Sequence, residues 1–355
     1  MTYPGLAALS GIGLLNLEPL GQVYEIGEAP ASASFLRFVQ PEAATDVFDH
    51  DRNALFGSLL TLASNRRCQV APEVVAGVEG TGTALFLPMT HQMDPELAAP
   101  MPPWSRMRNS IADYAARLST MEPADAAAIT AAMRMHYNSA LLYTRDITGA
   151  YALAVGGIEA LASRFGPSYV AWDDWHRAKS WDKFLDSQNL SADQAAAIRE
   201  KLLGEQHVKL TEKFTTYFCQ GVSPEFWREK VRGYVWGINA NTGEAIEGSW
   251  VDQGLRSMQF ADDPGALRKA VRAAYGRRSQ YIHAGEHGGG FVAEVFGDGP
   301  GRARNSLSYA QLRSGLRFLI LRELAARGRA GLKQEQRFVV PEAAPMKRPG
   351  AAFFQ

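Results

Sequence analysis

A short stretch near the end of a predicted helix carries two side chains that could act together on a phosphate. Arg278 and His283 lie within the segment from Tyr275 to Gly285. A guanidinium presents a planar fork of donors that fits phosphate oxygens, and an imidazole, with an ordinary pKa of about 6.5, can accept a proton near neutral pH. These residue types are candidates for a phosphate-binding cation and a general base.

The position of Arg278 on its helix gives a second reason to single it out. Five residues recur at steps of three and four and define one stripe: Leu267, Val271, Ala274, Arg278 and Ile282. The arginine therefore falls on the apolar side of its own helix. Because burial of a charge is costly unless the charge is paired, we expect Arg278 to meet a carboxylate, a partner subunit or a phosphate in a cleft.

A structural interpretation of the same two residues stays open. In that interpretation Arg278 pairs with Glu159 or another acid and ties helices together, while His283 occupies the helix C-terminus, where a cation is favourable. Five residues on an ideal helix are separated by about 140°, so the two side chains do not share a face. Joint action on one phosphate requires a helix that ends near His283, or two subunits that meet across a cleft.

The segment resembles the signature of HEPN domains, in particular their Apea-like branch. That branch has an aromatic residue, then Arg-Ser, then an apolar residue, then His-Gly. The matching positions here are Tyr275, Arg278-Ser279, Ile282 and His283, with Ala284 where glycine is usual. Other similar features are Gly157 to Leu161, the aromatic segment Leu210 to Phe218, and a long final helix after a Gly-rich loop. The resemblance covers residues 105–328 well and 45–90 weakly.

The resemblance implies a metal-independent RNA endonuclease without a cofactor, in which the 2′-hydroxyl of the substrate attacks the adjacent phosphate. His283 would accept the proton and Arg278 would stabilise the pentacoordinate phosphate. Accessory roles would fall to Ser279 as a phosphate donor, to Glu159 as the residue that orients a basic side chain, and to Arg277 as a solvated or RNA-contacting neighbour. The products would be a 2′,3′-cyclic phosphate and a 5′-hydroxyl, and DNA would be inert.

The same resemblance implies a homodimer with a shared active site, and a role in phage defence or in toxin-like growth arrest. Two other functions stay open. The first is a non-catalytic HEPN module that binds RNA or a protein partner. The second is a metal-dependent hydrolase built on His283 and His287, which the intervening Gly285 and the following Gly288 to Gly290 disfavour because they interrupt the helix that such a pair needs.

The segment Trp172 to His176 combines two tryptophans, two acids and a histidine. It could be a metal site or an aromatic platform. Adjacent acids point in different directions on a helix or a strand, so we expect a surface turn with a packed tryptophan.

The sequence pattern predicts a mainly α protein, whose helices must position these residues. We expect an N-terminal mixed α/β or α+β domain over residues 1–103 that senses a trigger or recruits a target, a helical bundle over 104–328 with an insertion at about 227–258, and a loose tail over 329–355. Helices are predicted from Arg52 to Arg67, Tyr137 to Phe165, Ser191 to Gln220, Asp263 to His283 and Ser306 to Ala326. Ser191 and Asp263 are expected to cap the helices that they begin, and Pro264 is expected to take the first helical position after Asp263. The apolar side of the last helix is formed by Leu312, Leu316, Leu319 and Leu324.

The composition excludes several classes of protein. The chain has 355 residues, of which 46% are hydrophobic, and a formal net charge of +0. This is a globular composition, and the neutral balance argues against indiscriminate binding of long nucleic acids. Two cysteines make a disulfide framework or a structural zinc site improbable, and the chain lacks a long apolar run. We therefore expect a cytoplasmic protein without a membrane span.

Overall fold

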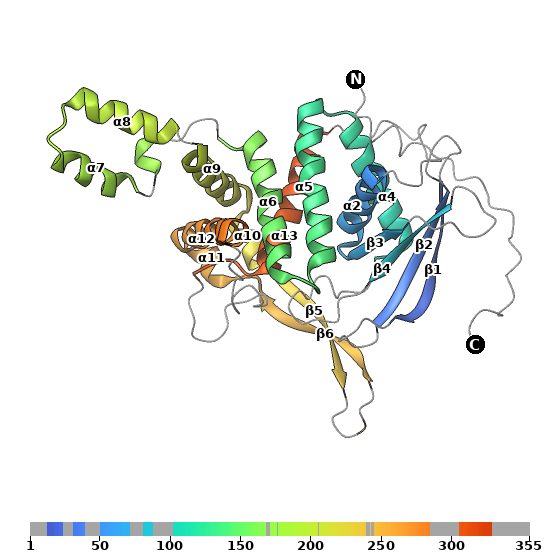
Figure 1. Cartoon of the computed structure of the whole chain (residues 1–355). Coiled ribbons are helices and arrows are strands. Elements are labelled where there is room, and N and C mark those ends of the chain that lie inside the picture. The colour runs from blue at the N-terminus through green and yellow to red at the C-terminus, as the bar shows by residue number, and fades with distance from the viewer. Residues whose placement is uncertain are drawn as a thin grey trace, which may run out of the picture.

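The protein is mainly helical, as predicted, and Figure 1 shows its helices gathered beside a small sheet. The computed structural model describes residues 13–23, 31–39, 50–71, 81–87, 102–167, 171–175, 177–204, 206–238, 242, 245–284 and 305–328. The predicted tail lies outside these residues. Among the helices within them, none is both long enough and apolar enough to cross a bilayer.

The bundle is built around the last described helix. Its helices are α4 (Trp104–Ser119), α5 (Pro123–Leu142), α6 (Ile147–Phe165), α9 (Gln206–Gly221), α12 (Pro264–Ala284) and α13 (Tyr309–Arg327). Helix α13 packs against α4, α5, α6 and α9. Its leucines at 312, 316, 319 and 324 are fully buried in one continuous core, so the predicted apolar side of this helix is confirmed.

Two long helices of the sequence-based prediction are each divided in the structure. The predicted helix from Tyr137 to Phe165 is wrong as a single element, because α5 ends at Leu142 and α6 begins at Ile147. The side chain of Asp146 accepts the Gly149 N–H at 2.9 Å. Such an N-cap bond stabilises a new helix start, while the apolar residues on both sides keep contact with the same core. Apolar spacing therefore did not reveal the break.

The predicted helix from Ser191 to Gln220 is likewise two helices, α8 (Ala192–Gly204) and α9. The predicted cap at Ser191 is confirmed: its hydroxyl accepts the Gln194 N–H at 3.2 Å, and its own N–H donates to the Gln194 side chain at 3.0 Å. This reciprocal pair is a capping box. Helix α8 pairs in Figure 1 with α7 (Ala178–Ser187), and both project from the bundle.

The described residues of the N-terminal part form an antiparallel sheet and the helix α2. The strands are β1 (Gly13–Val23), β2 (Ala31–Val39), β3 (Arg67–Ala71) and β4 (Thr81–Leu87), in the order β1-β2-β4-β3. Helix α2 (His50–Ser64) lies where a helix is predicted, but it ends at Ser64 and not at Arg67, which is the first residue of β3. The buried residues Leu55, Leu59 and Leu60 join the bundle core, so α2 shares one core with the helices that follow.

The predicted insertion at about 227–258 consists largely of a hairpin. After the short helix α10 (Pro224–Arg228), strands β5 (Lys230–Ile238) and β6 (Ala245–Leu255) pair in antiparallel fashion. The hairpin extends away from the helices in Figure 1. Helix α11 (Met258–Asp262) then leads back to α12.

One glycine permits a close approach between α6 and α13. A Cβ at Gly157 would lie 2.7 Å from the Leu316 side chain and 3.4 Å from the Ala132 carbonyl oxygen. Both distances are short for atoms that must pack without overlap. The absence of a side chain at this position lets α6 lie close to α13 and holds the following turn of α6, which includes Glu159, against the bundle.

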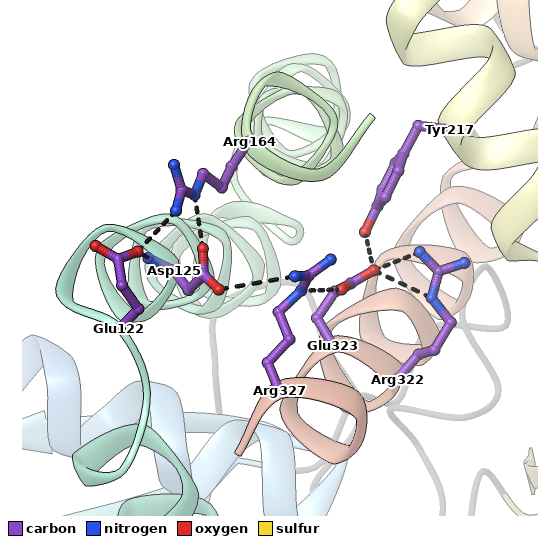
Figure 2. A network of polar contacts seen from close by, with 7 residues as sticks. All are labelled: Glu122, Asp125, Arg164, Tyr217, Arg322, Glu323 and Arg327. Atoms are coloured by element: carbon purple, nitrogen blue, oxygen red, sulfur yellow. Dashed lines mark hydrogen bonds and ion pairs between the residues drawn. The ribbon is translucent and has the colours of Figure 1, made fainter. Parts of the chain in front are cut away.

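A polar network ties the ends of four bundle helices together. Figure 2 shows its members, from the start of α5 and from α6, α9 and α13: Glu122, Asp125, Arg164, Tyr217, Arg322, Glu323 and Arg327. Buried Glu323 accepts from Tyr217 and Arg327 at 2.8 Å each, and also from Arg322. Because the carboxylate has several charge-assisted partners, its pKa lies below the ordinary value despite burial.

A second polar cluster joins α2 to the bundle. Asn65 follows α2 with a positive φ of 54°, a conformation that asparagine tolerates better than most residues. Its side chain accepts from Arg313 Nη1 at 2.8 Å, and the same nitrogen lies 3.4 Å from His136 Nε2. Arg317 on the next turn donates to the Leu62 carbonyl at 2.9 Å. Side chains of α13 and α5 thus hold the end of α2.

This cluster predicts a pH-dependent stability. Burial holds the pKa of His136 well below its usual value, and the charges of Arg313 and Arg317 lower it further. The native state keeps His136 neutral, whereas the unfolded chain protonates it below about pH 6.5, so the free energy of unfolding falls as the pH drops below that value. Urea unfolding of wild type and His136→Gln between pH 8 and pH 5 measures this effect.

All other residues are the same in both proteins, so the difference between the two unfolding free energies isolates His136. We expect wild type to be the more stable protein at pH 8 and its advantage to shrink toward pH 5. A difference that stays constant across the range would show that His136 is not held neutral.

Candidate functional site

Helix α12 positions the predicted site and is tied at its start by its own cap. The Asp263 side chain accepts the N–H groups of Gly265 and Ala266 at 2.8 and 3.0 Å, and Pro264 occupies the first helical position. Both features were predicted. The helix packs against α6 and α9, so its inner side chains face two neighbouring helices.

The first turns of α12 meet a buried carboxylate from α9. Glu212 has a side chain that is 1% exposed, and it accepts from Arg268 at 3.1 Å and from Arg272 at 2.9 Å. A buried carboxylate needs such charge-assisted partners. Sequence reasoning missed this residue, because a single glutamate within a helix gives no sign of which partner it will meet.

The middle of α12 meets a second carboxylate from α6, and this contact involves the predicted site. Arg278 Nη2 lies 3.3 Å from Glu159 Oε2, and the Tyr275 hydroxyl donates to Glu159 Oε1 at 3.3 Å. Of the three partners expected for Arg278, the described residues supply a carboxylate, Glu159, which is the acid named in the structural interpretation. Burial and the neighbouring carboxylate raise the pKa of Tyr275 to about 12, so its hydroxyl remains a donor at neutral pH.

The Arg278 guanidinium is held in place but not enclosed. Its side chain is 25% exposed, and that of Glu159 is 18% exposed. One of its donors, Nε, is buried without a hydrogen-bond partner among the residues that the structure describes. Since a guanidinium has five N–H donors and Glu159 engages one terminal nitrogen, the exposed part can still meet an outside acceptor.

The accessory candidates differ in their surroundings. Arg277 is half-buried. Burial raises the pKa of Tyr151 on α6 to about 12, although the positive charge of Arg277 acts in the opposite direction. The half-buried Arg277 side chain is therefore only partly solvated, and its contact with RNA stays a prediction. Ser279 is half-buried. The backbone of His283 belongs to the last turn of α12, while its side chain lies outside the described residues.

The C-terminal end of α12 is tied to the start of α6 by a contact that sequence reasoning missed. The Tyr281 hydroxyl donates to Asp146 Oδ2 at 2.8 Å, and this hydrogen bond raises the pKa of Tyr281. Asp146 thus caps α6 and holds α12 at the same time. The contact fixes the helix two residues before His283.

The helix is continuous through Arg278 and His283 and ends at Ala284. Regular helical geometry sets their Cβ atoms about 140° apart, as expected from the sequence. Because α12 ends one residue beyond His283, both arrangements expected from the sequence stay open: a site within one chain at the helix end, and a site shared by two subunits.

Two other segments were candidates for a metal site: the pair His283 and His287, and the segment from Trp172 to His176. No group of three His, Cys, Asp or Glu side chains that could hold a metal occurs in the described part of the chain, and His287 lies outside it. The segment from Trp172 to Asp174 forms a 3-10 turn, and Trp175 is 6% exposed. The predicted surface turn with a packed tryptophan is confirmed.

Comparison of the chain with protein-family models, with curated proteins and with solved structures gives no match. The class of the site must therefore be argued from the residues themselves.

Proposed function

We propose that this protein is a metal-independent RNA endonuclease of the HEPN kind, with Arg278 and His283 as its catalytic pair. The observation that supports the proposal most directly is the arrangement around Arg278. Glu159 and Tyr275 fix a partly exposed arginine on the helix that also carries His283. A cation held in advance at the surface is what a phosphate-binding site requires.

In the proposed reaction the 2′-hydroxyl of the RNA attacks the neighbouring phosphorus atom while His283 accepts the hydroxyl proton. Arg278 donates to the phosphate oxygens on which negative charge accumulates. The bond to the 5′-oxygen of the next nucleotide breaks, and this oxygen receives a proton. The products are a 2′,3′-cyclic phosphate and a 5′-hydroxyl. Glu159 acts as a positioning residue for Arg278, and Ser279 contributes a hydrogen bond to phosphate.

The separation of the two side chains around α12 leads us to propose a homodimer in which Arg278 of one subunit and His283 of the other act on the same phosphate. Residues 1–103 would sense a trigger or recruit the RNA, and the cleavage would serve phage defence or growth arrest. The junction of α2 with α5 and α13 gives such a signal a route into the bundle, because α2 shares the bundle core.

A second candidate function rests on the same contact. An arginine paired with a carboxylate from a neighbouring helix can serve only to join the two helices. The protein would then be a non-catalytic HEPN module that binds RNA or a protein partner. The two functions differ in whether the RNA is chemically changed.

The test is incubation of purified wild-type protein with a pool of cellular RNA in the presence of a chelator, followed by mapping of the product ends. We expect 2′,3′-cyclic phosphate and 5′-hydroxyl ends, and no cleavage of a matched 2′-O-methyl or DNA strand, since neither has the nucleophile. Binding of RNA without any new ends would support the binding module. Cleavage that the chelator abolishes would support the metal-dependent hydrolase.

A further inference from the structure

The α7–α8 hairpin carries a row of aromatic side chains that ends at the surface. The Trp172, Trp175 and Trp181 rings lie in a small cluster of their own, apart from the main core. The Trp175 and Trp181 rings are stacked with centroids 6.3 Å apart, and Phe184 meets the edge of Trp181 at 5.6 Å. Phe184 is 52% exposed. Phe184 belongs to α7, and the hairpin projects from the bundle in Figure 1.

The acids of α7 lie on the opposite side of the helix from Phe184, whereas the preceding N-cap residue Arg177 lies on the Phe184 side. With about 100° per residue, Arg177 lies about 20° from Phe184, and Trp181 about 60° from it. Arg177 is exposed. The two acids of the helix, Asp182 and Asp186, lie about 160° from Phe184 on the other side. The face of α7 around Phe184 therefore presents aromatic rings and the cation of Arg177. Neither carboxylate of α7 lies on this face.

One acid beside the aromatic cluster is already engaged. Asp182 accepts from the Trp172 indole N–H at 3.1 Å and from Arg199 Nε at 3.0 Å. These bonds hold its pKa below the ordinary value. The carboxylate thus fixes the tryptophan and the α8 arginine, and it does not oppose an anion on the outer face of α7.

We propose that this face of α7 is a platform for single-stranded RNA, with a base stacked on Phe184 and the adjacent phosphate on Arg177. Exposed aromatic rings next to cations are the combination that binds unpaired strands with little regard to sequence, since every base has a π-face. The inference rests on the proposed function in taking RNA as the ligand. It adds a second point of attachment, separate from the residues that would cleave the strand.

The experiment measures binding of a fluorescein-labelled oligoadenylate of about 12 nucleotides to the full-length chain by fluorescence anisotropy. The probe carries 2′-O-methyl groups, so it cannot be cleaved and binding is separated from catalysis. The variants are Phe184→Leu, which keeps an apolar side chain but removes the stacking ring, and Phe184→Trp, which restores a ring. Met258→Ala is the matched control, because Met258 is another exposed apolar residue, at 47% exposure, on a different helix.

We expect Phe184→Leu to weaken binding by about fivefold or more, as for the loss of one stacked base, while Phe184→Trp and Met258→Ala bind as wild type does. Arg177→Gln should weaken binding and reduce the salt dependence by about one phosphate contact. Unchanged affinity of Phe184→Leu would overturn the platform. So would a result in which Phe184→Leu alters only the sedimentation of the protein, which would make the face an interface between copies.

The platform and the proposed catalysis can fail separately. If affinity depends on Phe184 but wild type never produces cyclic-phosphate ends, the platform stands and the nuclease proposal falls. If wild type cleaves RNA and Phe184→Leu binds the probe unchanged, the nuclease proposal stands and the platform falls.

Discussion

Arg278→Ala protein is expected to cleave RNA at least about a hundredfold more slowly than wild type, since removal of one preformed donor to a developing oxyanion commonly costs that much. The fold should persist, because Arg278 is partly exposed and its partner Glu159 is itself 18% exposed. Single-turnover cleavage rates with saturating protein measure the chemical step, and circular dichroism checks the helix content.

The matched control is Arg228→Ala. Arg228 forms a similar ion pair, with Asp262 at 3.0 Å, but its side chain is 49% exposed and it lies on α10. Its loss should leave the cleavage rate unchanged. Equal rates for Arg278→Ala and wild type would remove Arg278 from the catalytic pair and leave it as a tie between α12 and α6.

The proposed homodimer leads to a further prediction about Arg278 and His283. If Arg278 of one subunit acts with His283 of the other, then mixing inactive Arg278→Ala and His283→Ala proteins restores part of the activity, because a mixed dimer contains one intact pair. A site contained in one chain would stay inactive in every mixture. Size-exclusion chromatography of the mixture, after unfolding and refolding together, shows whether mixed dimers have formed.

Arg313→Ala is expected to destabilise the protein by about 3–5 kcal/mol, the range for truncation of a large buried side chain to alanine. Arg313 is fully buried on α13 and donates to Asn65 at the end of α2. The substitution removes a large side chain and leaves the Asn65 carbonyl oxygen without this donor, so a cavity and an unsatisfied acceptor add to each other. Urea unfolding monitored by tryptophan fluorescence measures the change.

Arg313→Met keeps much of the side-chain volume and removes only the donors, so its smaller loss would separate packing from hydrogen bonding. Arg228→Ala again serves as the exposed control, for which we expect less than about 1 kcal/mol. A loss below about 1 kcal/mol for Arg313→Ala would show that the α2 junction does not depend on this arginine.

The starts of several helices were predictable because their signals are local. Ser191 and Asp263 are followed by residues whose N–H groups their side chains accept, and such contacts depend on neighbours only a few positions away. The apolar stripe of α13 was predictable for the same reason, since its period is a property of the helix itself. The position of Arg278 on a stripe also came from this periodicity.

The breaks inside the two long predicted helices were not predictable from apolar spacing. At Asp146 the chain leaves one helix and begins another while both keep their apolar residues on a shared core. The sequence contained a signal in the capping aspartate, but a capping residue inside a helical pattern also occurs as an ordinary exposed side chain. Packing decided between the two.

The sequence by itself determined that the protein is mainly helical, where α8 and α12 begin, and that Arg278 must find a partner for its charge. Only the tertiary structure decided that this partner is Glu159 with Tyr275 beside it, that Arg268 and Arg272 meet Glu212, and that the end of α2 is held by Arg313. The physical reason is the range of the interactions. Caps and stripes depend on residues within two turns, whereas an ion pair between helices depends on how those helices pack.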